Sequence, residues 1–332
     1  MSQPGAGART SRAIVAITAG LVAILAVGFN ARAEDYPARP LRVVVPYAAG
    51  GSTDVLARMI GQKLTAVLGQ PVVIDNRTGA GTLIATELVA HAAPDGYTLL
   101  MATPPLAVAP ALYQKLPFDV ARDFATVTNI AATSNVLVVH PSVPAQTARE
   151  FIALASASPG KYTFGSSGVG GASHLAVELF RSMTRIELVH VPYKGGSLAV
   201  IDLLGGRLSL MFANLTTVQQ HIKSGKLRAL AIGTAQRSLV VPELPTVAEA
   251  GVPGYEANNW NGLVAPAGSP RAALERLQRE IRAIVTAPDT RDKLLQNAFE
   301  PIADTPADFA RYLAAERVKW SRVVREGNIK PE

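Results

Sequence analysis

Short β-branched runs alternate along this chain with longer stretches whose apolar residues recur every three or four positions. Residues 41–45 (LRVVV) are the first such run and predict a strand buried on both faces. Residues 55–68 place apolar side chains at helical spacing, and Gly69 marks the end of that helix. Between the two, Gly50 and Gly51 allow a tight backbone turn. The pattern predicts a strand, a glycine turn and a helix.

The start of this helix is the first candidate for chemistry. Ser52, Thr53 or Asp54 is expected to cap it, because short polar side chains accept hydrogen bonds from the first helical amides. The other N–H groups of the first turn then point out of the carboxyl edge of the sheet. Anions bind well at such a place, and carboxylates especially.

The same unit repeats in the next fifty residues. Strands are predicted at 71–75 and 97–101, with a Gly-rich turn at 76–82 and a helix at 83–91 between them. Closely spaced steps of this kind predict a parallel sheet with helices on both faces and with all turns along one edge. Open α/β sheets bind their ligands at that edge.

A second series follows two linked strands, at 127–132 and 135–140, with Ser134 as the crossing point between them. Its Gly-rich turns, at 165–173 and 192–197, form a second row. The strands predicted for this series lie at 162–164, 186–191, 208–213 and 227–232. The predicted helices lie at 147–157 and 174–183, and two more end at 205–206 and near Gly225.

The chain changes character after residue 253. The predicted elements are a return strand at 255–264 and then only helices, at 270–285, 289–298 and 305–326. Those helices need a sheet to cover, and the first sheet is the expected host. We therefore predict a discontinuous domain 1 (34–133 and 256–332) with an inserted domain 2 (134–255). The two crossings would form a hinge that closes on a ligand held between the rows of turns.

The first 33 residues have the pattern of a secretory signal peptide. Arg9 and Arg12 begin it, residues 13–28 are apolar, and residues 31–33 form an A-x-A cleavage site. A retained membrane anchor is the alternative, but the apolar stretch is short for a membrane span. The chain has no cysteine, hence no disulfide and no lipoprotein attachment site, which favours a soluble periplasmic protein.

Net charge narrows the class of partner. The formal charge is +7, and without the first 33 residues the basic residues fall from 32 to 29, against 25 acidic ones. The remaining lysines and arginines are scattered, without a basic stripe or interleaved aromatic residues, which argues against nucleic-acid binding. A mildly positive field suits acidic small molecules.

Signatures of catalysis are missing from the sequence. Residues 165–168 (GSSG) do not have G-x-S-x-G spacing, and neither a P-loop nor H-E-x-x-H occurs. Residues 168–173 (GVGGAS) lack the third glycine of a dinucleotide fingerprint. The five histidines have no ligand spacing, and without cysteine a zinc site is not expected. We predict no catalytic residue, no metal, no cofactor and a protein that is not an enzyme.

Some charged and polar residues near the predicted turns have two interpretations. Lys194 would bind an anion or simply be solvated. Arg77 would pair with a ligand carboxylate, but a structural ion pair with Asp75 or Asp54 is favoured. His174, near the start of its helix, is more often a packing group than a ligand contact.

Seven segments carry a resemblance to a known family. They are YPARP at 36–40, VPYAAGGSTD at 45–54, NRTGAG at 76–81, APDGYTL at 93–99, GSSG at 165–168, HVPYKGG at 190–196 and PTVAEAG at 245–251. Together, and in this order, they cover essentially the whole mature chain. The combination resembles the Bug family, the periplasmic solute-binding proteins of tripartite tricarboxylate transporters.

The resemblance implies a fold of the periplasmic binding protein type II class (Venus flytrap), with two α/β domains joined by a two-crossing hinge. It also implies a small carboxylate ligand: an aromatic or aliphatic acid, a dicarboxylate, an acidic amino acid or a nicotinate-like acid. In the family, the first two Gly-rich turns hold a carboxylate, partly through ordered water. The domain 2 turns meet the other end of the ligand.

On this basis we expect two sets of ligand-binding residues. The proximal carboxylate would be held by Tyr47, Ala49, Gly50, Gly51, Ser52, Gly79, Ala80, Gly81, Thr82 and Thr103. The distal wall would be formed by Ser166, Ser167, Gly168, Gly170, Tyr193, Gly195, Asn214 and Trp260. Trp260 has an equal alternative, which is to pack the hinge.

The sequence departs from the family pattern in three places. The usual P-F-x-P-G-G is PYAAGG at 46–51, and the usual proline of N-R-P-G-A-G is Thr78. Where the family often has M-F-D-N-L, residues 211–215 are MFANL, so Ala213 replaces an aspartate. If that aspartate reaches the cleft in relatives, its loss predicts a ligand with an anionic or apolar distal end.

We therefore predict a monomeric periplasmic protein that captures a small carboxylate and delivers it to membrane permease subunits of a tripartite tricarboxylate transporter. Two alternatives stay open. One is a periplasmic sensor that presents its liganded state to a receptor kinase. The other is an enzyme that acts on carboxylates, which the missing nucleophile–base set disfavours.

Overall fold

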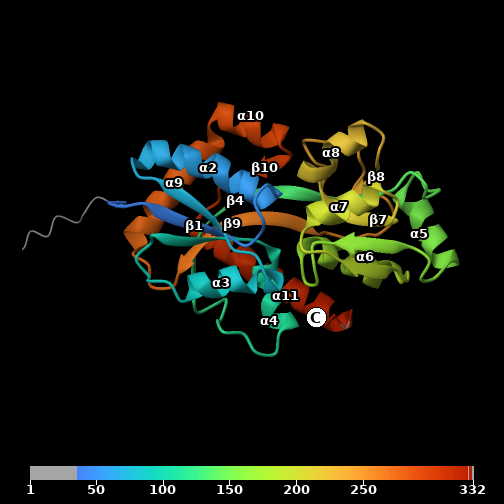
Figure 1. Cartoon of the computed structure of the whole chain (residues 1–332), viewed down its shortest axis with the longest axis horizontal. Coiled ribbons are helices and arrows are strands. Elements are labelled where there is room, and N and C mark those ends of the chain that lie inside the picture. Colours follow the sequence, from blue (N-terminus) through green and yellow to red (C-terminus); the bar gives the residue numbers. More distant parts are fainter. Residues whose placement is uncertain (1–35, 328, 331–332) are drawn as a thin grey trace, which may run out of the picture. The chain divides into compact units, whose positions relative to one another are not determined.

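The first strand–turn–helix steps are present in the computed structural model, which describes residues 36–327 and 329–330 (Figure 1). Strand β1 pairs in parallel with both β2 and β3, as predicted. The elements are β1 (Leu41–Val45), α2 (Ser52–Leu68), β2 (Val72–Asn76), α3 (Leu83–Ala90), β3 (Thr98–Ala102) and α4 (Pro104–Leu112). Every element named here and below belongs to the unit that begins at Arg39.

The two linked strands predicted around Ser134 are one continuous strand, β4 (Phe124–Val139). Up to Ser134 this strand pairs antiparallel with β9 (Asn258–Pro266), and from Asn135 onward it pairs with β7 and β8. Ser134 is therefore the point where β4 changes partners, and the strand is not interrupted there.

The second series of strands and helices is present in the predicted order. Strand β5 pairs in parallel with β6 and with β7. The elements are α5 (Ala148–Ala157), β5 (Thr163–Ser166), α6 (Ala172–Thr184), β6 (Val189–Pro192), α7 (Gly196–Leu204), β7 (Leu210–Asn214), α8 (Leu215–Lys223) and β8 (Arg228–Ile232). They gather around the second half of β4, on the right in Figure 1.

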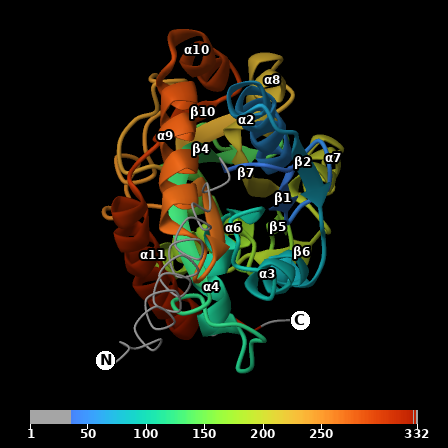
Figure 2. The same ribbon diagram turned by 90° about the vertical axis from the view of Figure 1, so that its left-hand side faces the viewer.

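In the part of the chain that the structure describes, the strands form a continuous sheet in the order β2-β1-β3-β9-β4-β7-β5-β6, and β8 and the short β10 (Phe299–Pro301) also pair with β4. Three helices follow the return strand β9, namely α9 (Arg271–Thr286), α10 (Pro288–Gln296) and α11 (Pro306–Glu326). Helix α9 packs on β4 and α2, and α11 packs on β4 and α4 (Figure 2). This confirms that the C-terminal helices cover the first part of the sheet.

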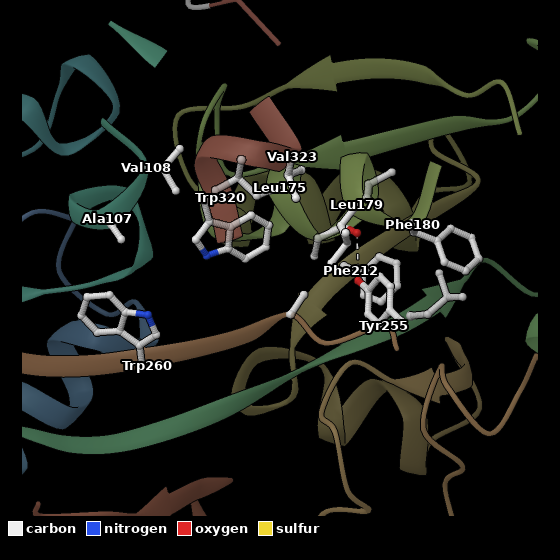
Figure 3. Close-up of a cluster of buried hydrophobic side chains, with 14 of the residues drawn as sticks. Ala107, Val108, Leu175, Leu179, Phe180, Phe212, Tyr255, Trp260, Trp320 and Val323 are labelled. Carbon is white, nitrogen blue, oxygen red and sulfur yellow. Dashed lines mark hydrogen bonds between the residues drawn. The ribbon is translucent and has the colours of Figure 1, made fainter. Parts of the chain in front are cut away.

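A large apolar cluster includes residues from both series of strands. Phe180, Phe212 and Tyr255 pack together, with Phe212 stacked on Tyr255 at 5.5 Å between ring centroids (Figure 3). The Tyr255 hydroxyl donates a hydrogen bond of 2.8 Å to the carbonyl of Ala176, which satisfies the one polar atom of that buried ring. Trp320 of α11 lies against α6 in the same cluster (Figure 3).

The predicted signal peptide, residues 1–33, lies outside the residues that the structure describes. Within residues 36–327 and 329–330, none of the helices combines the length and the apolar character that a membrane span requires.

Candidate functional site

Six helices of the described chain begin at the turns that end strands of the sheet, and none of them has a side-chain N-cap. They are α2, α3, α4, α6, α7 and α8, with Gly51, Thr82, Thr103, Gly171, Gly195 and Asn214 at the N-cap positions. Of the other helices, α5 and α11 have a side-chain cap, in which Thr147 and Thr305 accept a hydrogen bond from a first-turn amide, whereas α9 and α10 have none. A helix start whose amides are not bonded to a cap side chain is suited to an external anion.

The prediction that Ser52, Thr53 or Asp54 caps α2 is wrong. Helix α2 starts at Ser52 after an extended Gly51, so Asp54 lies inside its first turn. The Asp54 carboxylate instead accepts a hydrogen bond of 2.8 Å from the amide of Gly50. Burial raises the pKa of Asp54, but hydrogen bonds from Arg58, from that amide and from Asn76 outweigh this effect and hold the pKa below its usual value. Asp54 is thus an ionised group that fixes the first turn.

Tyr47 and Thr103 connect the first and third turns of the first row. The Tyr47 hydroxyl lies 3.3 Å from Thr103 Oγ1, and the carbonyl of Tyr47 accepts a hydrogen bond of 2.9 Å from Asn76 Nδ2. Burial raises the pKa of the Tyr47 phenol, so the group stays protonated at neutral pH and remains a hydrogen-bond donor.

The second turn has four successive residues with positive φ. The angles are +128° at Gly79, +47° at Ala80, +60° at Gly81 and +88° at Thr82. Ala80 and Thr82 carry side chains, and a residue with a Cβ in such a conformation costs about 1–3 kcal/mol. Strain of this kind concentrates at functional sites, which agrees with the sequence prediction for this turn.

Arg77 and Lys194, the two basic residues with alternative interpretations, have different surroundings in the structure. Arg77 Nε lies 3.0 Å from Asp75 Oδ1, and Asp75 also accepts hydrogen bonds from Arg42. This is the structural ion pair that the sequence favoured. Lys194 is exposed, in agreement with the solvated alternative.

The first turn of the second row uses its own side chains as acceptors. Ser173 Oγ accepts a hydrogen bond of 2.8 Å from the amide of Ser167, and Ser166 Oγ accepts one of 3.2 Å from the amide of Gly168. Ser166 itself is completely buried. The hydroxyl groups of this turn therefore stabilise its backbone, and the backbone is the surface that it offers to a ligand.

Three other predicted distal residues have defined partners or positions. The Tyr193 hydroxyl donates a hydrogen bond of 2.7 Å to Asp202, in α7. Gly195 is the N-cap of α7. Trp260 is completely buried, donates from Nε1 to Glu316 at 3.2 Å and packs edge-on against Phe309. For Trp260 this placement corresponds to the packing alternative.

The two rows of turns meet at Asn214. Its side-chain Nδ2 donates a hydrogen bond of 2.9 Å to Ser52 Oγ, and its Oδ1 accepts one of 3.0 Å from Asn259 Nδ2. A Cβ on Gly81 would lie 3.5 Å from the carbonyl oxygen of Val169, so the second turn of the first row faces the first turn of the second row. The structure thus brings predicted proximal and distal residues to one place.

Sequence reasoning missed two polar residues of the return strand. Asn259 reaches Asn214, and the buried Asn261 accepts a hydrogen bond of 2.9 Å from Thr53 Oγ1. The run NNWN at 258–261 is an available signal, because three amides in an otherwise apolar strand need partners. Ala213, the third departure from the family pattern, is completely buried in an apolar cluster with Val136. Its side chain therefore packs in the core of the second series.

Comparisons with known proteins agree with this geometry. Residues 56–329 match the family described as "Tripartite tricarboxylate transporter family receptor". BugT of Bordetella pertussis is 37% identical over 319 residues, which are 96% of this chain and 98% of BugT. A structure titled "R. palustris Rpa4515 with adipate" is 37% identical with a TM-score of 0.85, over 90% of this chain and 100% of that chain. MatC from Rhodopseudomonas palustris with bound malate is 31% identical with a TM-score of 0.81, over 87% and 100%.

These similarities confirm the fold class as well as the resemblance. The mixed α/β architecture, with its two series of strands and helices, is the two-domain, type II-like fold of periplasmic binding proteins. The chain therefore belongs to the tripartite tricarboxylate transporter receptor family, which includes the Bug proteins.

Proposed function

We propose that this protein is an extracytoplasmic solute-binding protein that captures a small carboxylate between its two rows of turns and passes it to the permease of a tripartite tricarboxylate transporter. The observation that carries the proposal is a set of five helix starts along the turns of both rows, those of α2, α3, α6, α7 and α8, which have no side-chain cap. Helix α4 does not belong to this set, because its first two residues are prolines without an N–H group. Two solved relatives hold adipate and malate, and both of these ligands are dicarboxylates.

Neutral donors are the groups that we assign to the proximal carboxylate. The α2 and α3 helix starts supply backbone amides, and the Tyr47 phenol is protonated at neutral pH. The nearest charged groups of the first turn, Asp54 and Arg58, neutralise each other at 3.0 Å. A carboxylate in this site would therefore lie against the dipoles of these donors, and no unpaired acidic side chain of the first turn would repel it.

Capture also requires movement between the two series of strands and helices. We propose that they move as the two predicted domains, domain 1 (34–133 and 256–332) and domain 2 (134–255). The partner change of β4 after Ser134 supports one crossing, and the hydrogen bond from Ala257 to Gly233 is adjacent to the other. We expect the protein to work as a monomer in the periplasm.

Thermal unfolding tests the proposal directly. The full-length gene is expressed, the protein is purified from the periplasmic fraction, and bound ligand is removed by unfolding and refolding. A panel of adipate, malate, succinate, benzoate, glutamate and nicotinate is compared with adipamide, which has the length of adipate but no charge. An acid at one hundred times its Kd should add about 2.7 kcal/mol, a shift of several degrees. A panel that leaves the midpoint unchanged, or an equal shift with adipamide, would contradict carboxylate capture.

A further inference from the structure

A pair of stacked histidines lies directly beneath the first turn of the second row. His174 of α6 and His190 of β6 have ring centroids 4.2 Å apart and planes inclined by 22°. Phe164 of β5 stacks on His190 at 4.6 Å and lies 6.2 Å from His174. His174 is 5% exposed and therefore requires specific hydrogen-bond partners, whereas His190 is half-buried.

His174 holds one amide of the turn directly. The amide of Gly170 donates a hydrogen bond of 3.1 Å to His174 Nδ1. A nitrogen that accepts this bond carries no proton, so the imidazole is neutral and has its proton on Nε2. That nitrogen faces Glu178 Oε1 at 3.7 Å, and Arg181 donates to the same carboxylate oxygen at 2.6 Å.

His190 holds a second amide through a serine. His190 Nε2 and Ser166 Oγ share a hydrogen bond of 2.6 Å, and Ser166 Oγ accepts the amide of Gly168 at 3.2 Å. A serine close to a histidine is also the beginning of a nucleophile–base arrangement. Here the serine side chain is completely buried and bonded within its own turn, so it is not placed to attack a substrate.

The turn that these histidines hold is the part of the second row that faces the first row. A Cβ on Gly170 would lie 2.4 Å from Leu112 Cδ1, at the end of α4. Gly168 and Gly170 both have positive φ, +114° and +73°, a conformation that glycine adopts without strain. Other hydrogen bonds also hold this turn, among them one of 3.1 Å from the amide of Gly171 to the carbonyl of Gly168. The amides of Gly170 and Gly168 themselves donate to His174 and to the serine that His190 binds.

We propose that His174 and His190 are positioning residues for ligand capture, which fix the amides of Gly170 and Gly168 and thereby the shape of the 168–171 turn in its binding-competent form. The proposal rests on the function proposed above, since it assigns the turn to the ligand site. His174 is too deeply buried to be the contact itself, and the Nε2 of the half-buried His190 is hydrogen-bonded to Ser166. In this proposal each ring acts through the backbone that it holds.

Paired asparagine and glutamine variants test this assignment. The amide of asparagine occupies the place of imidazole Nδ1, whereas that of glutamine reaches the place of Nε2. His174→Asn and His190→Gln therefore keep the bond that each ring makes, and His174→Gln and His190→Asn lose it. All four variants lose the ring stacking, so stacking cannot distinguish them. Thermal midpoints confirm that each variant is folded.

Two measurements are made on each variant. Calorimetry gives the Kd for the panel acid that the wild type binds best. We expect affinity within about threefold of wild type for the two variants that keep the bond, and affinity at least about tenfold weaker for the two that lose it. NMR hydrogen exchange gives the protection of the Gly168 and Gly170 amides in the free protein. Gly170 should lose protection in His174→Gln and keep it in His174→Asn, and Gly168 should respond in the same way to the His190 variants.

If the Asn and Gln variants of the same histidine had equal affinity or equal amide protection, the assignment would be overturned. A wild-type protein that binds no acid of the panel would contradict the proposed function instead. In that case the exchange measurement still decides whether the two rings fix the turn, so the two failures are distinguishable.

Discussion

Asn214 Nδ2 lies 2.9 Å from Ser52 Oγ and so joins the carboxyl end of β7 to the first residue of α2. The same Asn214 side chain accepts a hydrogen bond from Asn259 of the return strand. One amide therefore connects the two rows of turns and the strand that runs back between them. A contact with this placement is expected to form when the domains approach and to break when they separate.

A double-mutant cycle on Ser52→Ala and Asn214→Ala should show a coupling of about 1 kcal/mol in ligand binding, because either change removes the same hydrogen bond. Each single variant should weaken binding about fivefold, and the double variant should be hardly weaker than Asn214→Ala. Calorimetric titration with the preferred acid measures all four proteins.

Asn297→Ala is the matched control for this cycle. Asn297 donates one hydrogen bond, of 2.8 Å, to the carbonyl of Lys293 at the end of α10. Its loss should leave the Kd unchanged. Strictly additive effects of Ser52→Ala and Asn214→Ala would show that the contact does not contribute to the bound state.

Gly81→Ala should weaken ligand binding by at least about tenfold. The glycine has a φ of +60°, and a Cβ would lie 3.2 Å from the Tyr113 hydroxyl. The strained turn would therefore have to move, and its amides with it. Gly225→Ala is the control, because Gly225 has a φ of +72° with nothing within 4 Å of the added Cβ. Both variants should lose about 1 kcal/mol of stability, measured by urea unfolding. Equal affinities for the two would contradict a role of the second turn in binding.

The free energy of unfolding should fall as the pH is lowered from 7 to 5. Burial, the neighbouring His190 and Arg181 lower the pKa of His174 to about 3, and burial and Arg181 lower that of His190 to about 4. Unfolded imidazoles have a pKa of about 6.5 and so take up protons in this range, while the folded rings stay neutral. Proton uptake by the unfolded state alone reduces stability.

The double variant His174→Asn/His190→Gln should have a flatter dependence between pH 5 and 7, measured by urea unfolding at fixed ionic strength. Glu178 and Arg181, which face the pair, are present in both proteins. An unchanged slope would mean that neither ring contributes to it, because both take up protons in the folded protein as they do in the unfolded chain.

Glu316→Leu should lower the free energy of unfolding by about 2–4 kcal/mol without changing the Kd. Glu316 Oε2 accepts hydrogen bonds from both indoles of the chain, Trp260 at 3.2 Å and Trp320 at 2.9 Å. Leucine leaves two buried N–H groups without an acceptor, whereas Glu316→Gln keeps an oxygen for them and should retain most of the stability.

Since both indoles are buried, ligand binding should leave the tryptophan emission maximum unchanged. A clear shift on binding would return Trp260 to the ligand wall.

The order of the elements could be predicted from the sequence because each strand–turn–helix step has its own local signals. The continuity of β4 could not, because the polar residues around Ser134 indicate a break. Helix α4 was hidden by its prolines, two of which lie in the first turn where proline is tolerated. The three residues of β10 are too few to form a pattern.

The site was predictable as a set of backbone turns but not as a set of side-chain contacts. Glycine and serine runs mark a turn, yet nothing local indicates that Asp54 bonds to Gly50 and caps no helix. His174 lies in the first turn of α6 and His190 lies in β6, so only the packing of α6 on the sheet brings their rings together. The partnership of Asn214 with Ser52 likewise joins residues far apart in the sequence.

The apolar cluster described above contains Val44 of β1, Phe164 of β5 and Trp320 of α11. Residues of the first series and residues of the second series are therefore buried together on folding and exposed to water together on unfolding. A protein with separate cores would melt in two steps, with the inserted segment as an independent folding unit. Here a shared core predicts a single cooperative transition, in which calorimetric and van't Hoff enthalpies agree and neither half persists without the other.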